Sequence, residues 1–108
     1  MNSPKLYIYY STISPQKEAE KLSKTLVENK IAICVNIIPN VISFYNEKSK
    51  VLRSNESVLI IKSFFTPARF CKELKTRHIY EIPFISRIDS KSLNPDYTNW
   101  AKNNLFNS

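Results

Sequence analysis

Three side chains in this sequence belong to residue types that bind transition metals: the thiol of Cys34, the imidazole of His78 and the carboxylate of Glu81. Imidazole and thiolate are good ligands for copper and zinc, and a carboxylate can complete such a set. A bound cation needs two or more of these groups to converge. One histidine followed three residues later by one glutamate is not a ligand signature by itself. These residue types therefore permit a metal site, and their spacing does not specify one.

Each of the three residues also has a structural role open to it. His78 is expected at the C-terminal end of a helix, where the helix dipole favours an imidazole and Glu81 would hydrogen-bond to it. Strand alternation places Cys34 on the same face as Asn36, where a small thiol packs as a hydrophobic group. Cys34 and Cys71 are too few for a disulfide scaffold, and we expect both to be reduced. Metal binding and packing both remain open at these positions.

Several classes of catalytic and nucleotide-binding site are excluded by composition. The chain contains no glycine, and a phosphate-binding loop, a Rossmann fingerprint and a Walker loop all need glycine for close approach of the backbone. It has one histidine, no Gly-x-Ser-x-Gly elbow and no recognisable triad. We therefore expect a protein that is not an enzyme.

The elements that must position these side chains are organised around residues 31–65. Two arms rich in Val, Ile and Phe flank a polar break and predict a long antiparallel hairpin. Pro39 cannot donate to a strand ladder and predicts a bulge, beside which Asn40 tolerates positive φ. Asn46 is the candidate for the strained position in the turn. A hairpin of this length extends past a small domain, so a neighbouring subunit is expected to cover its far end, around Phe44, Tyr45 and Val51.

The rest of the chain supplies helices and strands on either side of this hairpin. Ser14-Pro15, Thr66-Pro67 and Asn94-Pro95 each predict a helix start, with a polar N-cap before a proline. We expect a strand over 5–11, then a helix over 15–28 that stops at a left-handed Asn29, and then the hairpin. After the hairpin we expect a helix from 67 to the Arg77–His78 pair and a strand over 82–88. A C-terminal helix should follow and pack Trp100 over the last strand. This order predicts a ferredoxin-like α+β sandwich.

Length and charge set further limits. At 108 residues, the chain 1–108 is expected to form a single domain. No apolar run approaches the roughly 18 residues of a membrane span, and the first residues lack the flanks of a signal peptide, so we expect a cytoplasmic protein without membrane contact. The net charge is +7, but the lysines are spread along the chain. A compositional bias explains this charge more simply than an acidic partner does.

Nucleic-acid binding is the main alternative from another functional class, because RNA-recognition modules share this order of elements. Such modules present aromatic side chains on central strands, and here Tyr7, Tyr9 and Phe64 are the candidates. The chain has neither a glycine-containing motif nor a run that mixes basic and aromatic residues. We therefore do not expect nucleic acid as a partner.

Three stretches together resemble the CutA family, whose members are described as divalent-cation tolerance proteins. Residues 32–39 (AICVNIIP) are close to the family's A-A-C-V-N-I-I-P, and residues 78–83 (HIYEIP) are close to H-P-Y-E-V-P. Residues 94–97 (NPDY), followed by Trp100, are like the family's N-P-D-Y-x-x-W. The order and separation of the three stretches also match, so the resemblance covers nearly the whole chain.

The resemblance implies the same ferredoxin-like fold, in a tight homotrimer whose long hairpins pack against neighbouring subunits. It also implies a non-enzymatic protein that binds Cu(II) or another divalent metal ion, with His78, Glu81 and Cys34 as the candidate ligands. The trimer is similar to that of PII signalling proteins, so a sensor of a small ligand is the alternative function.

The chain departs from the family pattern at several positions. Residues 45–50 (YNEKSK) stand where the family has patterns such as Y-W-W-E-G-K, so the hairpin tip must turn differently. Ile79 replaces a proline of the family motif. Ser11 and Arg77 stand where some members carry a cysteine and a second histidine. These two replacements reduce the set of ligands available for copper.

Overall fold

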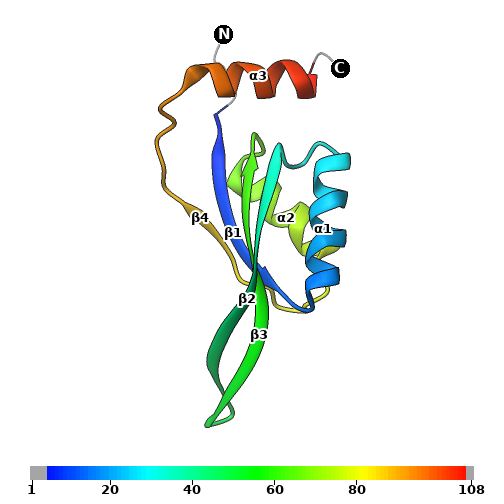
Figure 1. Ribbon diagram of the computed structural model, residues 1–108, viewed down its shortest axis with the longest axis vertical. Coiled ribbons are helices and arrows are strands. Elements are labelled where there is room, and N and C mark those ends of the chain that lie inside the picture. Colours follow the sequence, from blue (N-terminus) through cyan, green and yellow to red (C-terminus); the bar gives the residue numbers. More distant parts are fainter. Residues whose placement is uncertain (1–4, 107–108) are drawn as a thin grey trace.

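Apolar residues that alternate along the strands produce a four-stranded antiparallel sheet in the order β2-β3-β1-β4 (Figure 1). The computed structural model describes residues 5–106. The strands are β1 (Tyr7–Ile13), β2 (Cys34–Glu47), β3 (Lys50–Ser63) and β4 (Ile85–Ile88), and the helices are α1 (Gln16–Glu28), α2 (Pro67–Arg77) and α3 (Pro95–Phe106). The predicted ferredoxin-like α+β fold is confirmed by this order.

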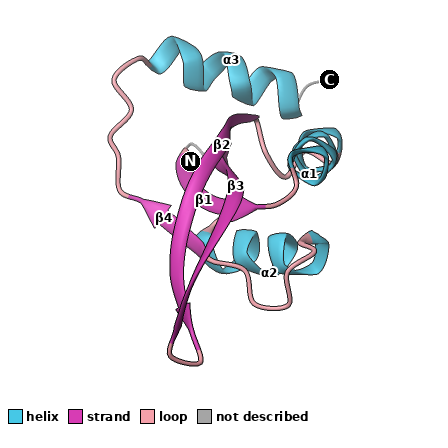
Figure 2. Ribbon diagram, turned by 60° about the horizontal axis from the view of Figure 1, so that its bottom comes forward, coloured by secondary structure: helices cyan, strands magenta, loops and turns pink. Residues whose placement is uncertain are grey.

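Helices α1 and α2 cover one face of the sheet, and the core lies between them and the strands (Figure 2). The ring of Tyr9 stacks on that of Phe70 with 4.0 Å between the centroids. The Tyr9 hydroxyl donates to the carbonyl oxygen of Phe65 at 2.7 Å, which satisfies its polar atom inside the core. The other buried apolar side chains are Ile13, Ala19, Leu22, Leu26, Ile31, Ala32, Leu59, Ile61 and Leu74.

Over most of its length the opposite face of the sheet is not covered by a helix of residues 5–106, and we call it the open face. Helix α3 contacts it at one end, where the Lys62 ammonium lies 4.9 Å from the ring centroid of Tyr97. The registers pair Tyr10 with Ile60 and Thr12 with Val58, and these side chains point away from the core because neighbouring residues alternate between faces. Ile38 and Ile88 lie on the same face and are partly exposed. The central part of the open face is therefore largely apolar. None of the helices in residues 5–106 is long and apolar enough to cross a membrane.

The predicted bulge in β2 is confirmed. Ile38 pairs with Val58 while Val41 pairs with Glu56, so β2 advances by one residue more than β3 at this point. Asn40 has φ 60°, the left-handed conformation that an asparagine tolerates. Proline and asparagine together therefore perform here the role that a glycine often has in a bulge.

The predictions for two other left-handed positions were wrong by one or more residues. Asn29 has φ −88°, and Lys30, with φ 59°, is the left-handed residue after α1. At the hairpin tip, Lys48 and Ser49 have φ 51° and 66°. Asn46 instead accepts a hydrogen bond at Oδ1 from the Ser49 backbone N–H, at 3.2 Å. Its side chain stabilises the turn without adopting the strained conformation itself.

The predicted helix starts are confirmed at two of three positions. Thr66 is the N-cap of α2 with Pro67 at the first helical position. Asn94 precedes α3, and its Oδ1 accepts from the Asp96 backbone N–H at 3.1 Å. Ser14 is not the N-cap of α1, because Pro15 is extended and takes that position, and the helix begins at Gln16.

The last strand and the C-terminal helix also differ from expectation. Strand β4 starts only at Ile85, where pairing with β1 begins, so Ile82 lies outside it and is exposed. Helix α3 lies across the end of the sheet rather than over β4 (Figure 1). It buries Ala101, whereas the side chain of Trp100 is 54% exposed, so the predicted packing of Trp100 is wrong within one chain.

Candidate functional site

His78 ends helix α2, and backbone atoms contact both of its ring nitrogens. Its backbone N–H donates to the carbonyl of Leu74 at 2.8 Å, which makes it the C-cap residue. Nε2 lies 2.9 Å from the carbonyl oxygen of Thr12 in β1, and Nδ1 lies 3.0 Å from the backbone nitrogen of Tyr80. The expected hydrogen bond between His78 and Glu81 is therefore wrong, because the ring is already engaged by other partners.

Tyr80 links this histidine to the root of the hairpin. The Tyr80 hydroxyl donates to Oε2 of Glu56 at 2.9 Å, and its ring centroid lies 4.7 Å from that of His78. Burial, followed by the hydrogen bond to the Glu56 carboxylate, raises the pKa of Tyr80 to about 12. The phenol is therefore protonated at neutral pH and acts as the donor in this contact.

A concave surface of about 710 Å³ lies beside this contact, and we call it the hairpin-root concavity. Its volume falls within the range of small-molecule sites. The strands contribute hydroxyl, carboxylate and tyrosine side chains from the open face, and the loop after α2 contributes a mostly apolar wall. The lining residues are Thr12, Ser14, Ser43, Tyr45, Glu47, Ser54, Glu56, Tyr80, Ile82 and Phe84. The sequence analysis missed this surface, although Glu56 beside the predicted bulge was a signal for it.

The structure does not bring His78, Glu81 and Cys34 together. Cys34 is on the open face opposite Lys62, which pairs with Ile8 of β1, whereas the His78 ring contacts Thr12. Those two β1 positions are separated by about 13 Å of strand. Glu81 is exposed in the loop after α2. Residues 5–106 contain no group of three or more His, Cys, Asp or Glu side chains that would hold a metal ion. Within one chain, the predicted donor set does not fit a divalent cation.

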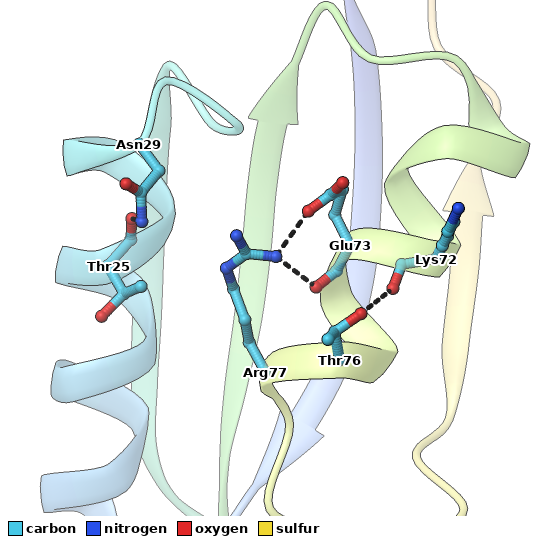
Figure 3. A network of polar contacts seen from close by, with 6 residues as sticks. All are labelled: Thr25, Asn29, Lys72, Glu73, Thr76 and Arg77. Carbon is cyan, nitrogen blue, oxygen red and sulfur yellow. Dashed lines mark hydrogen bonds and ion pairs between the residues drawn. The ribbon is translucent and has the colours of Figure 1, made fainter.

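The two replaced positions have structural partners instead. Ser11 is buried, and its Oγ donates to the carbonyl oxygen of Phe84 at 2.7 Å, which ties β1 to the start of β4. Arg77 forms an ion pair with Glu73 one helical turn earlier in α2 (Figure 3). A guanidinium is permanently charged and cannot bind a cation. Neither position supplies a metal ligand in this chain.

The hairpin places the three predicted interface residues on two different faces. Phe44 pairs with Arg53, and Val51 pairs with Asn46, so both lie on the face that the core occupies further along the sheet. They extend beyond the helices and are 69% and 73% exposed. Tyr45 lies on the opposite face and lines the hairpin-root concavity. The outer hairpin therefore carries its exposed apolar side chains on one face, and Tyr45 lies among mostly polar side chains on the other.

The aromatic residues considered for RNA binding are not arranged as a stacking surface. Tyr9 is buried against Phe70, and Tyr7 stacks on Tyr9 with 5.8 Å between centroids, on the side of the sheet that the helices cover. Phe64 contacts Phe106 of α3. A base would need exposed rings on the open face. The three predicted residues do not provide them.

We predict that folding stability falls as the solution becomes more acidic in the range in which histidine titrates. Burial lowers the pKa of His78 below its ordinary 6.5, against smaller opposite effects of Thr12 and Glu56. The unfolded chain therefore binds a proton more readily than the folded chain does. Stability is at its full value above the unfolded pKa and is lost as the pH falls toward the lower folded pKa. Urea unfolding between about pH 7 and pH 5 measures this loss, and a flat profile would contradict it.

Comparisons with known proteins agree on one family. The family model described as CutA1 divalent ion tolerance protein matches residues 7–104. The divalent-cation tolerance protein CutA of Thermus thermophilus is 31% identical over 94 residues, which are 86% of this chain and 91% of that protein. The chloroplastic protein CutA of Arabidopsis thaliana is 30% identical over 103 residues, and this chain spans only 56% of its length.

Solved structures of the same family have the same fold. The crystal structure of CutA1 from Oryza sativa superposes with a TM-score of 0.82 at 28% identity and covers 95% of each chain. The matches favour neither the PII-like sensor nor a nucleic-acid-binding module as an alternative function.

Proposed function

The chain belongs to the CutA1 family of divalent ion tolerance proteins, and on that premise we propose that it serves divalent-cation tolerance as a homotrimer without catalysis. The expected cytoplasmic location and the single-domain organisation are parts of this proposal. The absence of glycine supports the non-enzymatic role, because it excludes the nucleotide and phosphate loops on which many enzymes depend.

One observation supports the proposed association of subunits: the hairpin extends past the helices and exposes large apolar side chains to solvent. Ile42, Phe44 and Val51 share one face of the outer hairpin, and all three are exposed. A contiguous apolar patch of this kind marks an interaction surface, whereas scattered apolar residues do not. The open face of the sheet adds a second uncovered apolar surface beside it. A neighbouring copy that packs against the hairpin would cover both.

The proposal assigns no metal-binding step to the residues of one chain. The family name connects this protein to a divalent ion, for which we keep Cu(II) as one candidate, but the predicted donors do not converge within residues 5–106. We propose the hairpin-root concavity as the ligand-binding surface, because it lies beside the outer hairpin, where subunits would meet. Its carboxylates, Glu47 and Glu56, favour a positively charged contact there.

Light scattering of the purified protein at micromolar concentration tests the assembly. We expect a mass three times the chain mass of 12.6 kDa, unchanged on dilution across the micromolar range. The physical reason is the apolar area that a monomer would leave in water. A mass equal to that of one chain would overturn the trimer and, with it, the proposal that ligands bind in the hairpin-root concavity between subunits.

A further inference from the structure

We infer that His78, the only histidine of the chain, is a neutral hydrogen-bond clasp and not a metal ligand, so that divalent-cation tolerance in this protein proceeds without imidazole coordination. The inference rests on the divalent-cation role proposed above and does not depend on the trimer. It concerns three segments that meet at one ring: the end of β1, the loop after α2 and, through Tyr80, strand β3.

The partners of the ring determine which nitrogen carries the proton. The carbonyl oxygen of Thr12 can only accept, so Nε2, at 2.9 Å from it, must carry the hydrogen. The backbone nitrogen of Tyr80 can only donate, so Nδ1, at 3.0 Å from it, must offer its lone pair. One protonated and one unprotonated nitrogen define the neutral imidazole. Both partners are backbone atoms, so rotation of the Thr12 or Tyr80 side chain does not release the ring.

A metal ion would have to compete with these two bonds. Coordination through Nδ1 would displace the Tyr80 N–H, and coordination through Nε2 would remove the proton that the Thr12 carbonyl accepts. In either case a backbone polar group would lose its partner in a partly buried place, which costs free energy. His78 as a residue is only 8% exposed, so an ion also has little access to it. Glu56 is the charged side chain that faces the ring from β3, and the Tyr80 hydroxyl already contacts it.

The clasp also fixes the loop that forms one wall of the hairpin-root concavity. With the Tyr80 backbone held by His78, the phenol reaches Glu56 on β3, at a position next to the bulge. His78 is thus a positioning residue: it orders the residues after α2 so that Tyr80 meets the hairpin. Removal of the imidazole ring should let the Tyr80 backbone N–H exchange with solvent under conditions in which the protein is still folded.

The test combines metal titration with nitrogen NMR of the intact protein. In wild type, the ¹⁵N shifts of His78 should show a protonated Nε2 and an unprotonated Nδ1, and neither should move when Zn(II) is added. The same titration by calorimetry with Zn(II) and Cu(II) should show either no site or a site that His78→Asn and His78→Gln leave intact. A site lost in Cys34→Ser but retained in these two variants also supports the inference, because it excludes the imidazole.

The variants separate the clasp from simple instability. Asparagine can keep the acceptor for the Tyr80 N–H and glutamine can keep the donor for Thr12, whereas His78→Ala keeps neither. We expect the Tyr80 amide to exchange at least about tenfold faster in His78→Ala, with slower exchange restored in His78→Asn.

Zinc binding near one ion per chain that shifts the His78 nitrogens and disappears in both amide variants would overturn the inference. If every variant fails to fold, the ¹⁵N titration of the wild-type protein alone decides whether Zn(II) binds to the His78 ring nitrogens. Light scattering of the same samples reports on the trimer separately, so a monomer would contradict the proposed assembly while leaving the clasp unaffected.

Discussion

Replacing both Phe44 and Val51 with aspartate should convert the assembled protein into monomers. The two side chains belong to the exposed apolar face of the outer hairpin, and in the proposed trimer they are buried against a neighbour. A carboxylate buried there without a partner would have to be desolvated. We expect a loss of at least about 4 kcal/mol of association free energy, or about a thousandfold in the association constant. Light scattering and sedimentation at micromolar concentration measure the change in mass.

A matched control uses an exposed apolar residue away from the hairpin. Leu93 lies in the segment between β4 and α3 and is almost fully exposed, so Leu93→Asp should leave the mass unchanged. Far-ultraviolet circular dichroism should show that the double variant keeps its secondary structure, because the core lies elsewhere. A double variant that retains the wild-type mass would show that the outer hairpin does not hold the subunits together.

Truncating Phe70 to alanine should cost about 3–5 kcal/mol of folding free energy, the range found for large aromatic side chains in cores. Phe70 is fully buried on α2 and stacks on Tyr9 of β1, so it joins the helix layer to the sheet. Its removal leaves a cavity that the surrounding strands cannot fill. Urea unfolding at a fixed protein concentration measures the loss, because subunit association makes the apparent stability depend on concentration.

Phe106→Ala serves as the control for this measurement. Phe106 lies at the end of α3 and is 60% exposed, with its ring centroid 5.7 Å from that of Phe64. The same substitution should cost less than about 1 kcal/mol there, as is usual for surface positions. Equal losses in both variants would mean that the stacked pair of Tyr9 and Phe70 does not dominate the core.

The parts of the fold that local chemistry determines could be predicted from the sequence. Pro39 and Asn40 indicated the bulge because a missing N–H and a tolerance of positive φ belong to single residues. Thr66 and Asn94 indicated helix starts for the same reason. The hairpin followed from two long β-branched arms. These features need no knowledge of distant segments.

The features that were missed depend on contacts between distant parts of the chain. The partner of His78 is a backbone carbonyl 66 residues earlier, and nothing in the sequence around either residue reveals the contact. Tyr80 meets Glu56 because the bulge and the loop after α2 arrive at the same place. Trp100 was expected to be buried because it belongs to an apolar stripe of its own helix with Tyr97, Ala101 and Leu105, but of this stripe only Ala101 is fully buried.

The single extra residue at the bulge has a consequence for how this chain can tolerate deletions. Before the bulge, the even-numbered residues of β2 face the open side, as Ile38 does opposite Val58. After it, the odd-numbered residues do, as Tyr45 does opposite Leu52. Because β2 holds one residue more than β3 at the bulge, removing either Pro39 or Asn40 would leave a regular ladder in which each residue from Val41 onward keeps its partner and its face. Deletion of Ile42 or Ser43 would instead keep the bulge and move Phe44 to Tyr45's side of the sheet, so the position of a one-residue deletion decides whether it acts like a whole set of substitutions.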